Sequence, residues 1–283
     1  MAETSAPNAE AIGLWNKVLV PKFTRFRRVL ADGLSVHSQR ALAMHPVHPG
    51  ERVLDVGCGF GETTIELARA TGSALGIDCC EPFLEIARAD AARAGVAGAK
   101  FQLADGQTAT FEQPFDVCFA RFGTMFFSNP GAAMANLRRA TRPGGRLLMI
   151  VYRRIEDNAH FALAKQAVRK HLPPPPDEAP SCGPGPFSMA DSDTVSAILR
   201  SAHWSDVAFE RVDAEAWIGD TVDDALAFQL AIGPAGEIVR DAGPLGEEKR
   251  PLIVVELRGA LERFQTPRRV FMPTSSWCVT ARA

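Results

Sequence analysis

A short apolar run followed by three closely spaced glycines is the feature that most restricts the fold of this chain. The run Val53-Leu54-Asp55-Val56 leads into Gly57-Cys58-Gly59-Phe60-Gly61, and an amphipathic segment begins at Glu62-Thr63-Thr64. An apolar run of this length predicts a buried strand, and glycine allows a tight turn that a ligand can approach closely. The N-terminus of the following helix offers free N–H groups to a polar ligand. The pattern therefore predicts a strand–turn–helix unit with a ligand at the turn.

The same alternation of short apolar runs and amphipathic stretches continues along the chain. The sequence predicts strands over 52–56, 74–77, 100–103, 115–120 and 146–151, helices over 62–70, 82–94 and 132–140, and a turn over 142–145. Strands and helices that alternate at this spacing are typical of βαβ units and of a parallel sheet covered on both faces. We therefore expect an α/β fold around the glycine turn.

The flanking regions are less regular. We expect helices over 8–44, then helices over 157–171, 190–202, 221–231 and 247–264, with strands over 206–212 and 276–281. The segment 173–186 contains seven prolines and is predicted to be an extended loop. We interpret 1–48 as a helical lid, 49–152 as the ligand-binding core, and 153–283 as sheet-completing strands with a helical cap. Together they would form one domain.

Two acids follow strands that neighbour the glycine turn. Asp78 ends the second predicted strand, 17 residues after Gly61, where a carboxylate can accept hydrogen bonds from the hydroxyls of a ribose. Asp105 follows the third strand and would face the same crevice, where it can accept a hydrogen bond from an adenine amino group. The dinucleotide-binding pattern G-x-G-x-x-G places its third glycine one position later than this chain does. This spacing disfavours an NAD-dependent oxidoreductase.

Taken together, these motifs resemble those of the class I S-adenosylmethionine-dependent methyltransferases, most closely the small-molecule branch that includes quinone C-methyltransferases. The similarity spans about residues 50–152 and is carried by VLDVGCGFG, GIDCCEPFLEIAR, FQLADGQ and the region from 115 to 152. It implies a Rossmann-like sheet of seven strands, mostly parallel with an antiparallel last strand. It also implies S-adenosylmethionine as cofactor and contacts from Asp55, Gly57, Cys58, Gly59, Gly61, Asp78, Cys79, Asp105, Gly106, Arg121 and Phe122.

The resemblance assigns parts of the cofactor to parts of this list. Asp55 and the glycines would line the methionine moiety, Asp78 the ribose, and Asp105 with Gly106 the adenine. Cys79 stands where the family more often has an aliphatic residue, and it can pack against the adenine ring as an apolar contact. Arg121 and Phe122, just past the fourth predicted strand, would lie beside the cofactor.

The expected reaction is in-line transfer of a methyl group to a small-molecule acceptor. A methyl on sulfonium is already activated, so alignment and exclusion of water can supply much of the rate, and aromatic faces such as those of Trp15 and Phe126 can attract the positive charge. No motif identifies a general base; His37, His160 and Tyr152 are the candidates. Two alternatives remain at this point: a non-catalytic regulatory protein that binds S-adenosylmethionine, and an NAD-dependent oxidoreductase.

Composition excludes several other classes. The 283 residues carry a formal charge of −2, which argues against binding to nucleic acid through bulk charge, and no apolar stretch is long enough for a membrane span. The N-terminal sequence has no pattern of a secretory signal. The six cysteines show no repeated short spacing and no metal-ligand pattern, which predicts a reduced, cytoplasmic protein without a metal site. The oligomeric state and the methyl acceptor stay open.

Overall fold

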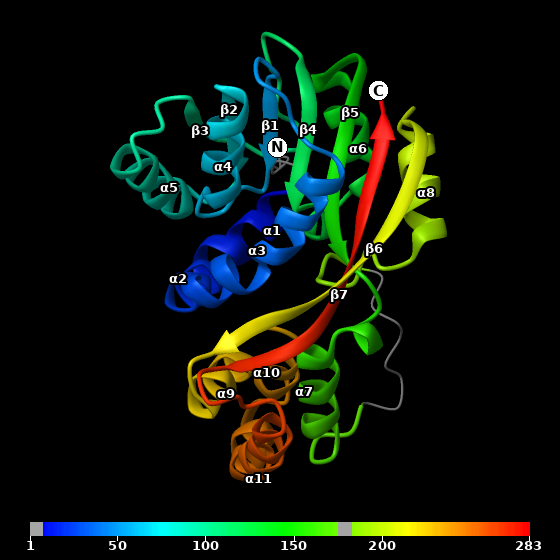
Figure 1. Ribbon diagram of the computed structural model, residues 1–283. Helices are drawn as coiled ribbons and strands as arrows, with labels where there is room; N and C mark the ends of the chain where they lie inside the picture. Colours follow the sequence, from blue (N-terminus) through cyan, green and yellow to red (C-terminus); the bar gives the residue numbers. More distant parts are fainter. Residues whose placement is uncertain (1–7, 175–182) are drawn as a thin grey trace, which may run out of the picture.

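A seven-stranded sheet forms the centre of the computed structural model, which describes residues 8–174 and 183–283 (Figure 1). The strands lie in the order β3-β2-β1-β4-β5-β7-β6. Strands β1 to β5 are mutually parallel, whereas β7 runs antiparallel to both β5 and β6. Their bounds are β1 Val53–Val56, β2 Ala74–Asp78, β3 Ala99–Leu103, β4 Phe115–Arg121, β5 Thr141–Tyr152, β6 Ser205–Gly219 and β7 Val270–Arg282. The predicted fold class, including the antiparallel last strand, is confirmed.

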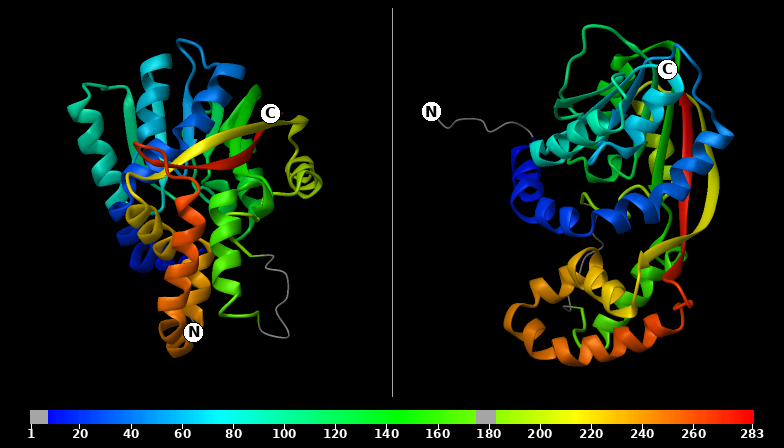
Figure 2. Two further views of the ribbon diagram at one scale, coloured as in Figure 1. Left: turned by 60° about the horizontal axis from the view of Figure 1, so that its bottom comes forward. Right: turned by 60° about the vertical axis from the view of Figure 1, so that its left-hand side comes forward.

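Helices cover both faces of this sheet. In the views of Figures 1 and 2, α3, α4 and α5 lie on one side, and α6 and α8 on the other. The first group comprises α1 Ala9–Leu14, a π-helical turn Trp15–Leu19, α2 Val20–Arg25, α3 Arg27–Met44, α4 Glu62–Thr71 and α5 Glu81–Arg93. The second comprises α6 Pro130–Ala140 and α8 Ser192–Ser201. The predicted helical region 8–44 is therefore interrupted at Phe26, which separates α2 from α3.

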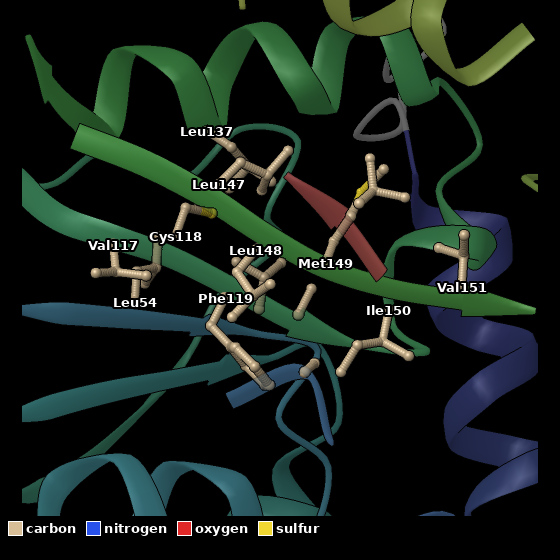
Figure 3. Packing of buried hydrophobic residues seen from close by; sticks show 14 of the residues in the cluster. Leu54, Val117, Cys118, Phe119, Leu137, Leu147, Leu148, Met149, Ile150 and Val151 are labelled. Atoms are coloured by element: carbon tan, nitrogen blue, oxygen red, sulfur yellow. The ribbon is translucent and has the colours of Figure 1, made fainter. Parts of the chain in front are cut away.

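The main hydrophobic core lies between the central strands and these helices. Every residue of β1 is buried, as expected for a strand that has parallel neighbours on both edges and helices on both faces. Leu54, Val117, Leu137 and Leu147 belong to one cluster of buried apolar side chains (Figure 3). The apolar run that predicted β1 is thus explained by burial on both sides of the sheet.

Strands β6 and β7 are much longer than the sequence predicted. They continue together past the end of β5, and their far ends carry α7 Ala159–Arg169, α9 Val222–Ala231, α10 Pro234–Asp241 and α11 Gly243–Glu262 (Figures 1 and 2). These four helices and the strand ends enclose a second buried cluster that includes Val168, Ala216, Ile253 and Met272. The helix expected over 247–264 corresponds to α11, and α10, which was not predicted, lies directly before it in the chain. Pro234 at the start of α10 is a helix-start signal that this interpretation overlooked.

Two further expectations meet a different outcome. The predicted turn over 142–145 lies within β5, because Phe115 pairs with Thr141 and Val117 with Arg146, so the extra residues form a bulge in the strand. Most of the proline-rich loop predicted over 173–186 lies outside the described residues, which omit 175–182. Within the described ranges, no helix is both long and apolar enough to cross a membrane.

The packing of α3 across β6 depends on a glycine. A Cβ on Gly33 would overlap the backbone carbonyl oxygen of Trp217, so the helix and strand approach more closely than any other residue would allow. We expect Gly33→Ala to lower the free energy of unfolding by about 1–3 kcal/mol, because the helix must move away from the strand. The measurement is chemical denaturation of the purified protein.

Gly259→Ala is the matched control for this substitution. Gly259 also lies in a helix, α11, but a Cβ there would meet no atom within 4 Å. We expect this change to be neutral or to stabilise the protein by about 0.5–1 kcal/mol, since alanine favours the helical backbone more than glycine does. Equal effects of the two changes would contradict the close approach at Gly33.

Candidate functional site

A cleft opens at the carboxyl ends of the central strands. It encloses about 1120 Å³ of empty space, including the part that opens to solvent. One wall comes from the residues after β1, β2, β3 and β4, and the opposite wall from α1, the π-helical turn, α2 and α3. Nine of the predicted cofactor contacts line it: Gly57, Cys58, Gly59, Asp78, Cys79, Asp105, Gly106, Arg121 and Phe122. The predicted contacts Asp55 and Gly61 are absent from the lining.

The glycine turn after β1 is held to the neighbouring strand β2. The backbone N–H groups of Gly57 and Cys58 both donate to the carbonyl oxygen of Ile77, at 2.9 and 3.0 Å. Gly57, Gly59 and Gly61 all have positive φ angles. Gly61 is the N-cap of α4, and a Cβ there would lie 2.7 Å from the Cβ of Ala87. Gly61 therefore shapes the turn from behind, and Gly57 and Gly59 present their backbone to the cleft.

Asp78 ends β2 with its carboxylate at the edge of the cleft. Oδ2 accepts a hydrogen bond from the backbone N–H of Gly59 at 2.9 Å, and Oδ1 accepts one from Cys80 at 3.0 Å. Burial raises the pKa of Asp78 from 3.8 to about 6, although these two hydrogen bonds act in the opposite direction. The carboxylate is thus fixed in orientation, and a ligand that donates hydrogen bonds to it would favour its ionised form.

Asp55 takes a different position, beneath the turn. Its Oδ2 atom accepts hydrogen bonds from the hydroxyls of Thr63 at 2.7 Å and Thr64 at 2.6 Å, which tie the first turn of α4 to β1. Its other oxygen, Oδ1, is buried without a hydrogen-bond partner among the described residues. Burial raises the pKa of this carboxyl group. Asp55 therefore supports the turn from below and keeps one acceptor oxygen free.

The loop after β3 closes one end of the cleft. Asp105 Oδ1 accepts from the backbone N–H of Gln107 at 2.9 Å, and the side chain of Asn136 donates to the carbonyl of Gly106 at 3.0 Å. A Cβ on Gly106 would lie 3.0 Å from the ring of Phe127. The loop is therefore fixed to α6, and the backbone at Gly106 lies against an aromatic ring at the cleft edge.

Arg121 and Phe122 lie at the end of β4 on the floor of the cleft. Strand β4 is one residue longer than predicted, so Arg121 is its last residue and not the first residue after it. The Arg121 side chain is 12% exposed, and its guanidinium lies 3.8 Å from Glu62 Oε2. Phe122 has a φ of 58°, a strained backbone conformation for a residue with a side chain. A strained backbone persists only where the surrounding structure holds it, and such residues are concentrated at functional sites. The fold therefore fixes the position of the Phe122 ring.

The three catalytic candidates lie outside the cleft lining, on the far side of Phe122. Tyr152 stacks on the Phe122 ring with centroids 4.3 Å apart, and His37 contacts the same ring edge-on. Burial lowers the pKa of His37 to about 4 and that of His160 to about 3. At neutral pH both imidazoles are uncharged and are poor bases, since a general base works best with a pKa near the working pH.

The N-terminal helices form an aromatic roof over the cleft that the sequence indicated only in part. Trp15 contacts Phe23 and Phe126 edge-on, with centroids 5.1 and 5.0 Å apart. Arg27 fastens this roof to the core, since it pairs with Glu62 at 3.1 Å and with Asp90. Glu62 also lines the cleft and was not predicted, although its place directly after Gly61 is a signal for it.

The buried contact between Asp55 and α4 yields a test of the turn. We expect Thr64→Val, which keeps the shape of the side chain, to lower the free energy of unfolding by about 1–3 kcal/mol, because a buried carboxyl oxygen loses a hydrogen bond. Thr24→Val is the control, since the Thr24 hydroxyl donates only to the carbonyl of Val20 in its own exposed helix. Denaturation curves that move equally for both variants would contradict the supporting role of Asp55.

Comparison with known proteins places this cleft in context. Residues 53–145 match the family described as "Methyltransferase domain". The chain is 32% identical over 120 residues to the ubiquinone/menaquinone biosynthesis C-methyltransferase UbiE of Burkholderia orbicola, with 41% of this chain and 49% of that protein covered. It is 33% identical over 114 residues to the nocamycin O-methyltransferase of Saccharothrix syringae, with 39% and 41% covered. The chain thus spans about half or less of the length of these curated relatives.

Solved structures show the same architecture. The phosphoethanolamine N-methyltransferase 2 of Haemonchus contortus, solved in complex with S-adenosyl-L-methionine, superposes with a TM-score of 0.58 and covers 96% of this chain and 59% of its own. At 14% sequence identity this likeness concerns the fold alone. The sequence match over 53–145, the strand order and the turn geometry agree with one another. Residues 53–145 therefore match a methyltransferase domain in sequence, and the chain shares the fold of solved methyltransferase structures.

Proposed function

We propose that this protein transfers a methyl group from S-adenosylmethionine to a small-molecule acceptor by in-line displacement. The observation that carries the proposal is the convergence of four strand ends on one cleft. Asp78 follows β2, the glycine turn follows β1, Asp105 follows β3, and Arg121 ends β4, and all of them line the same space. In open α/β sheets, ligands bind at such carboxyl strand ends where the strand order reverses.

The residues present fit the cofactor in shape and in chemistry. The backbone of Gly59 leaves room where a side chain would project, and Gly57 lies against the backbone of Gly123. The Asp78 carboxylate can accept hydrogen bonds from ribose hydroxyls. Asp105 and Gly106 stand at the adenine end of this arrangement. In this proposal the guanidinium of Arg121, which lines the cleft, contacts the carboxylate of the methionine moiety, and Asp55 acts from beneath the turn as its support. When bound, the cofactor supplies a methyl group on a positively charged sulfur.

The remaining work of the protein is alignment and exclusion of water. Phe122 and Phe126 border the cleft from the segment after β4, and Trp15 borders it from the roof, so aromatic side chains lie on both sides of the space proposed for the sulfonium. Aromatic faces attract a cation by about 1 kcal/mol each, and correct positioning of two reactants contributes about 7–11 kcal/mol in favourable cases. In this proposal His37 and Tyr152 hold Phe122 in place, His160 packs against Tyr152, and the acceptor needs no strong base.

The acceptor is proposed to be small and partly apolar. The roof and floor of the cleft are rich in aromatic and aliphatic side chains, among them Trp15, Leu30, Leu34, Phe122 and Phe126. The relatives are named as methylating carbon, oxygen and nitrogen, so the acceptor atom does not transfer from them to this chain. We propose that the helices before residue 49 act as the lid and that the region after 152 caps the acceptor side.

The two alternatives from the sequence predict different binding and turnover. A regulatory protein would bind the cofactor without transferring methyl groups, and an NAD-dependent oxidoreductase would bind NAD in the cleft. The comparisons favour neither alternative. Thermal-shift titration with S-adenosylhomocysteine and with NAD tests the oxidoreductase alternative. Transfer of labelled methyl groups to a panel of quinones, phenols and amines tests the alternative of a non-catalytic regulatory protein. Failure to bind S-adenosylhomocysteine in calorimetry would overturn the proposed function.

Removal of the Asp78 carboxylate tests the ribose contact. We expect Asp78→Ala to weaken binding of S-adenosylhomocysteine at least tenfold, or about 1.4 kcal/mol, because two ligand hydroxyls lose a charged acceptor. Isothermal titration calorimetry measures this directly. Asp193→Ala, at an exposed acid in α8 on the other side of the sheet, should leave the affinity unchanged. Unchanged affinity in Asp78→Ala would remove this residue from the site.

The pKa of Asp78 predicts how binding varies with pH. In the free protein this pKa is about 6, and hydroxyl donors favour the ionised form, so binding below pH 6 requires loss of a proton. We therefore expect affinity for S-adenosylhomocysteine to rise as the pH increases through 6 and to level off above 7. At pH 5 it should be about tenfold below the plateau. The Asp78→Asn variant should lose this dependence; the same slope in that variant would assign the titration to another group.

A further inference from the structure

Two adjacent thiols lie beside Asp78 at the edge of the cleft, and the proposed function uses no thiol chemistry from either. The Sγ atoms of Cys79 and Cys80 are 3.8 Å apart and point to the same side of the chain at the start of α5. Cys79 is half-buried and lines the cleft, whereas Cys80 is fully buried against Phe60 and Phe83. The two sulfurs therefore form a pair that is reachable from the cleft through Cys79.

The separation of these sulfurs has a chemical meaning. Two thiolates bound to one tetrahedral Zn²⁺ at about 2.3 Å each lie about 3.8 Å from one another. Cys79 and Cys80 already have this Sγ–Sγ distance, so the backbone need not move. Metal sites are usually indicated in a sequence by cysteines that are two or more residues apart, and adjacent cysteines do not show that pattern. The sequence-based prediction of no metal site rested on those spacings alone.

A third ligand atom stands beside the pair. A carboxylate oxygen of Asp78 and the two Sγ atoms all lie within 4.8 Å of one another. The backbone here is held in place: the N–H of Cys80 donates to Asp78, and the side chain of Asn16 donates to the carbonyl of Cys79 at 3.3 Å. Two thiolates and a carboxylate on a rigid turn suit a borderline or soft divalent cation such as Zn²⁺ or Cd²⁺.

We propose that Asp78, Cys79 and Cys80 form a binding site for a thiophilic divalent cation, and that its occupation excludes S-adenosylmethionine from the cleft. Both thiols lose their protons to solvent as two metal–sulfur bonds form, and no group is oxidised or reduced. The metal takes the Asp78 carboxylate from the ribose and occupies the space beside it, while the loss of two thiol protons leaves the net charge of the site unchanged. The exclusion of the cofactor rests on the proposed function, whereas the metal site does not.

Cadmium is the probe for the metal site, because thiolate-to-cadmium charge transfer absorbs in the ultraviolet. Titration of the reduced full chain should give one equivalent of this absorption, with binding at least tenfold weaker in both Cys79→Ser and Cys80→Ser. Cys278→Ser is the matched control, since Cys278 belongs to another group of potential ligands with His45 and Glu210. Binding that is lost in Cys278→Ser, or retained in both of the other variants, overturns the proposal.

A second titration tests the exclusion of the cofactor. Calorimetry with S-adenosylhomocysteine should show at least tenfold weaker binding in the presence of one equivalent of cadmium, and Cys80→Ser should abolish this effect. If cadmium occupies the thiol pair and the affinity stays unchanged, exclusion is overturned. If the ligand fails to bind even without metal, the proposed function fails, and the absorption titration still decides the metal site. Melting curves verify folding, and Cys79→Ala replaces any serine variant that fails to fold.

Discussion

The position of β1 between β2 and β4 is the constraint on which the rest of the structure depends. Because chain order reverses on either side of β1, the helices that follow β1 and β4 leave the sheet on opposite faces, and a cleft opens at the strand ends between them. The hydrogen bonds from Gly57 and Cys58 to Ile77 extend the β1–β2 pairing into the turn. The parallel pairing therefore places the glycine backbone and Asp78 side by side.

Two aspartates on neighbouring strands illustrate how the surroundings give one residue type different tasks. Asp55 accepts two threonine hydroxyls in the core and holds α4 against β1. Asp78 accepts hydrogen bonds from the backbone N–H groups of Gly59 and Cys80 and keeps its carboxylate at the cleft edge. Both were predicted as cofactor contacts, and only Asp78 lines the cleft. The difference arises because Thr63 and Thr64 reach back beneath the turn, which no spacing rule reveals.

The long strands β6 and β7 extend beyond the part of the sheet that lines the cleft, and their far ends help to form a second buried cluster. The cluster joins α7, α9, α10 and α11 to the strand ends, while α3 crosses β6 at Gly33 and links the roof of the cleft to this part. The UbiE protein of Burkholderia orbicola and the nocamycin O-methyltransferase match this chain only within about half of their length or less. The strand ends that line the cleft thus lie in the part of the chain that matches the methyltransferase-domain family, and in our proposal the helices beyond β5 cap the acceptor side.

The sequence by itself determined the strand–turn–helix units, the order of the sheet motifs and the strand-end residues, because local glycine and apolar patterns encode these features directly. It did not determine the length of β6 and β7, the split into α10 and α11 or the bulge at the start of β5, since these depend on pairing between distant strands. Only the tertiary structure decided that His37 and His160 are buried and uncharged, and that Cys79 and Cys80 bring their sulfurs together beside Asp78. Burial and side-chain direction depend on how each side chain packs against residues from distant parts of the sequence, so local sequence patterns do not reveal them.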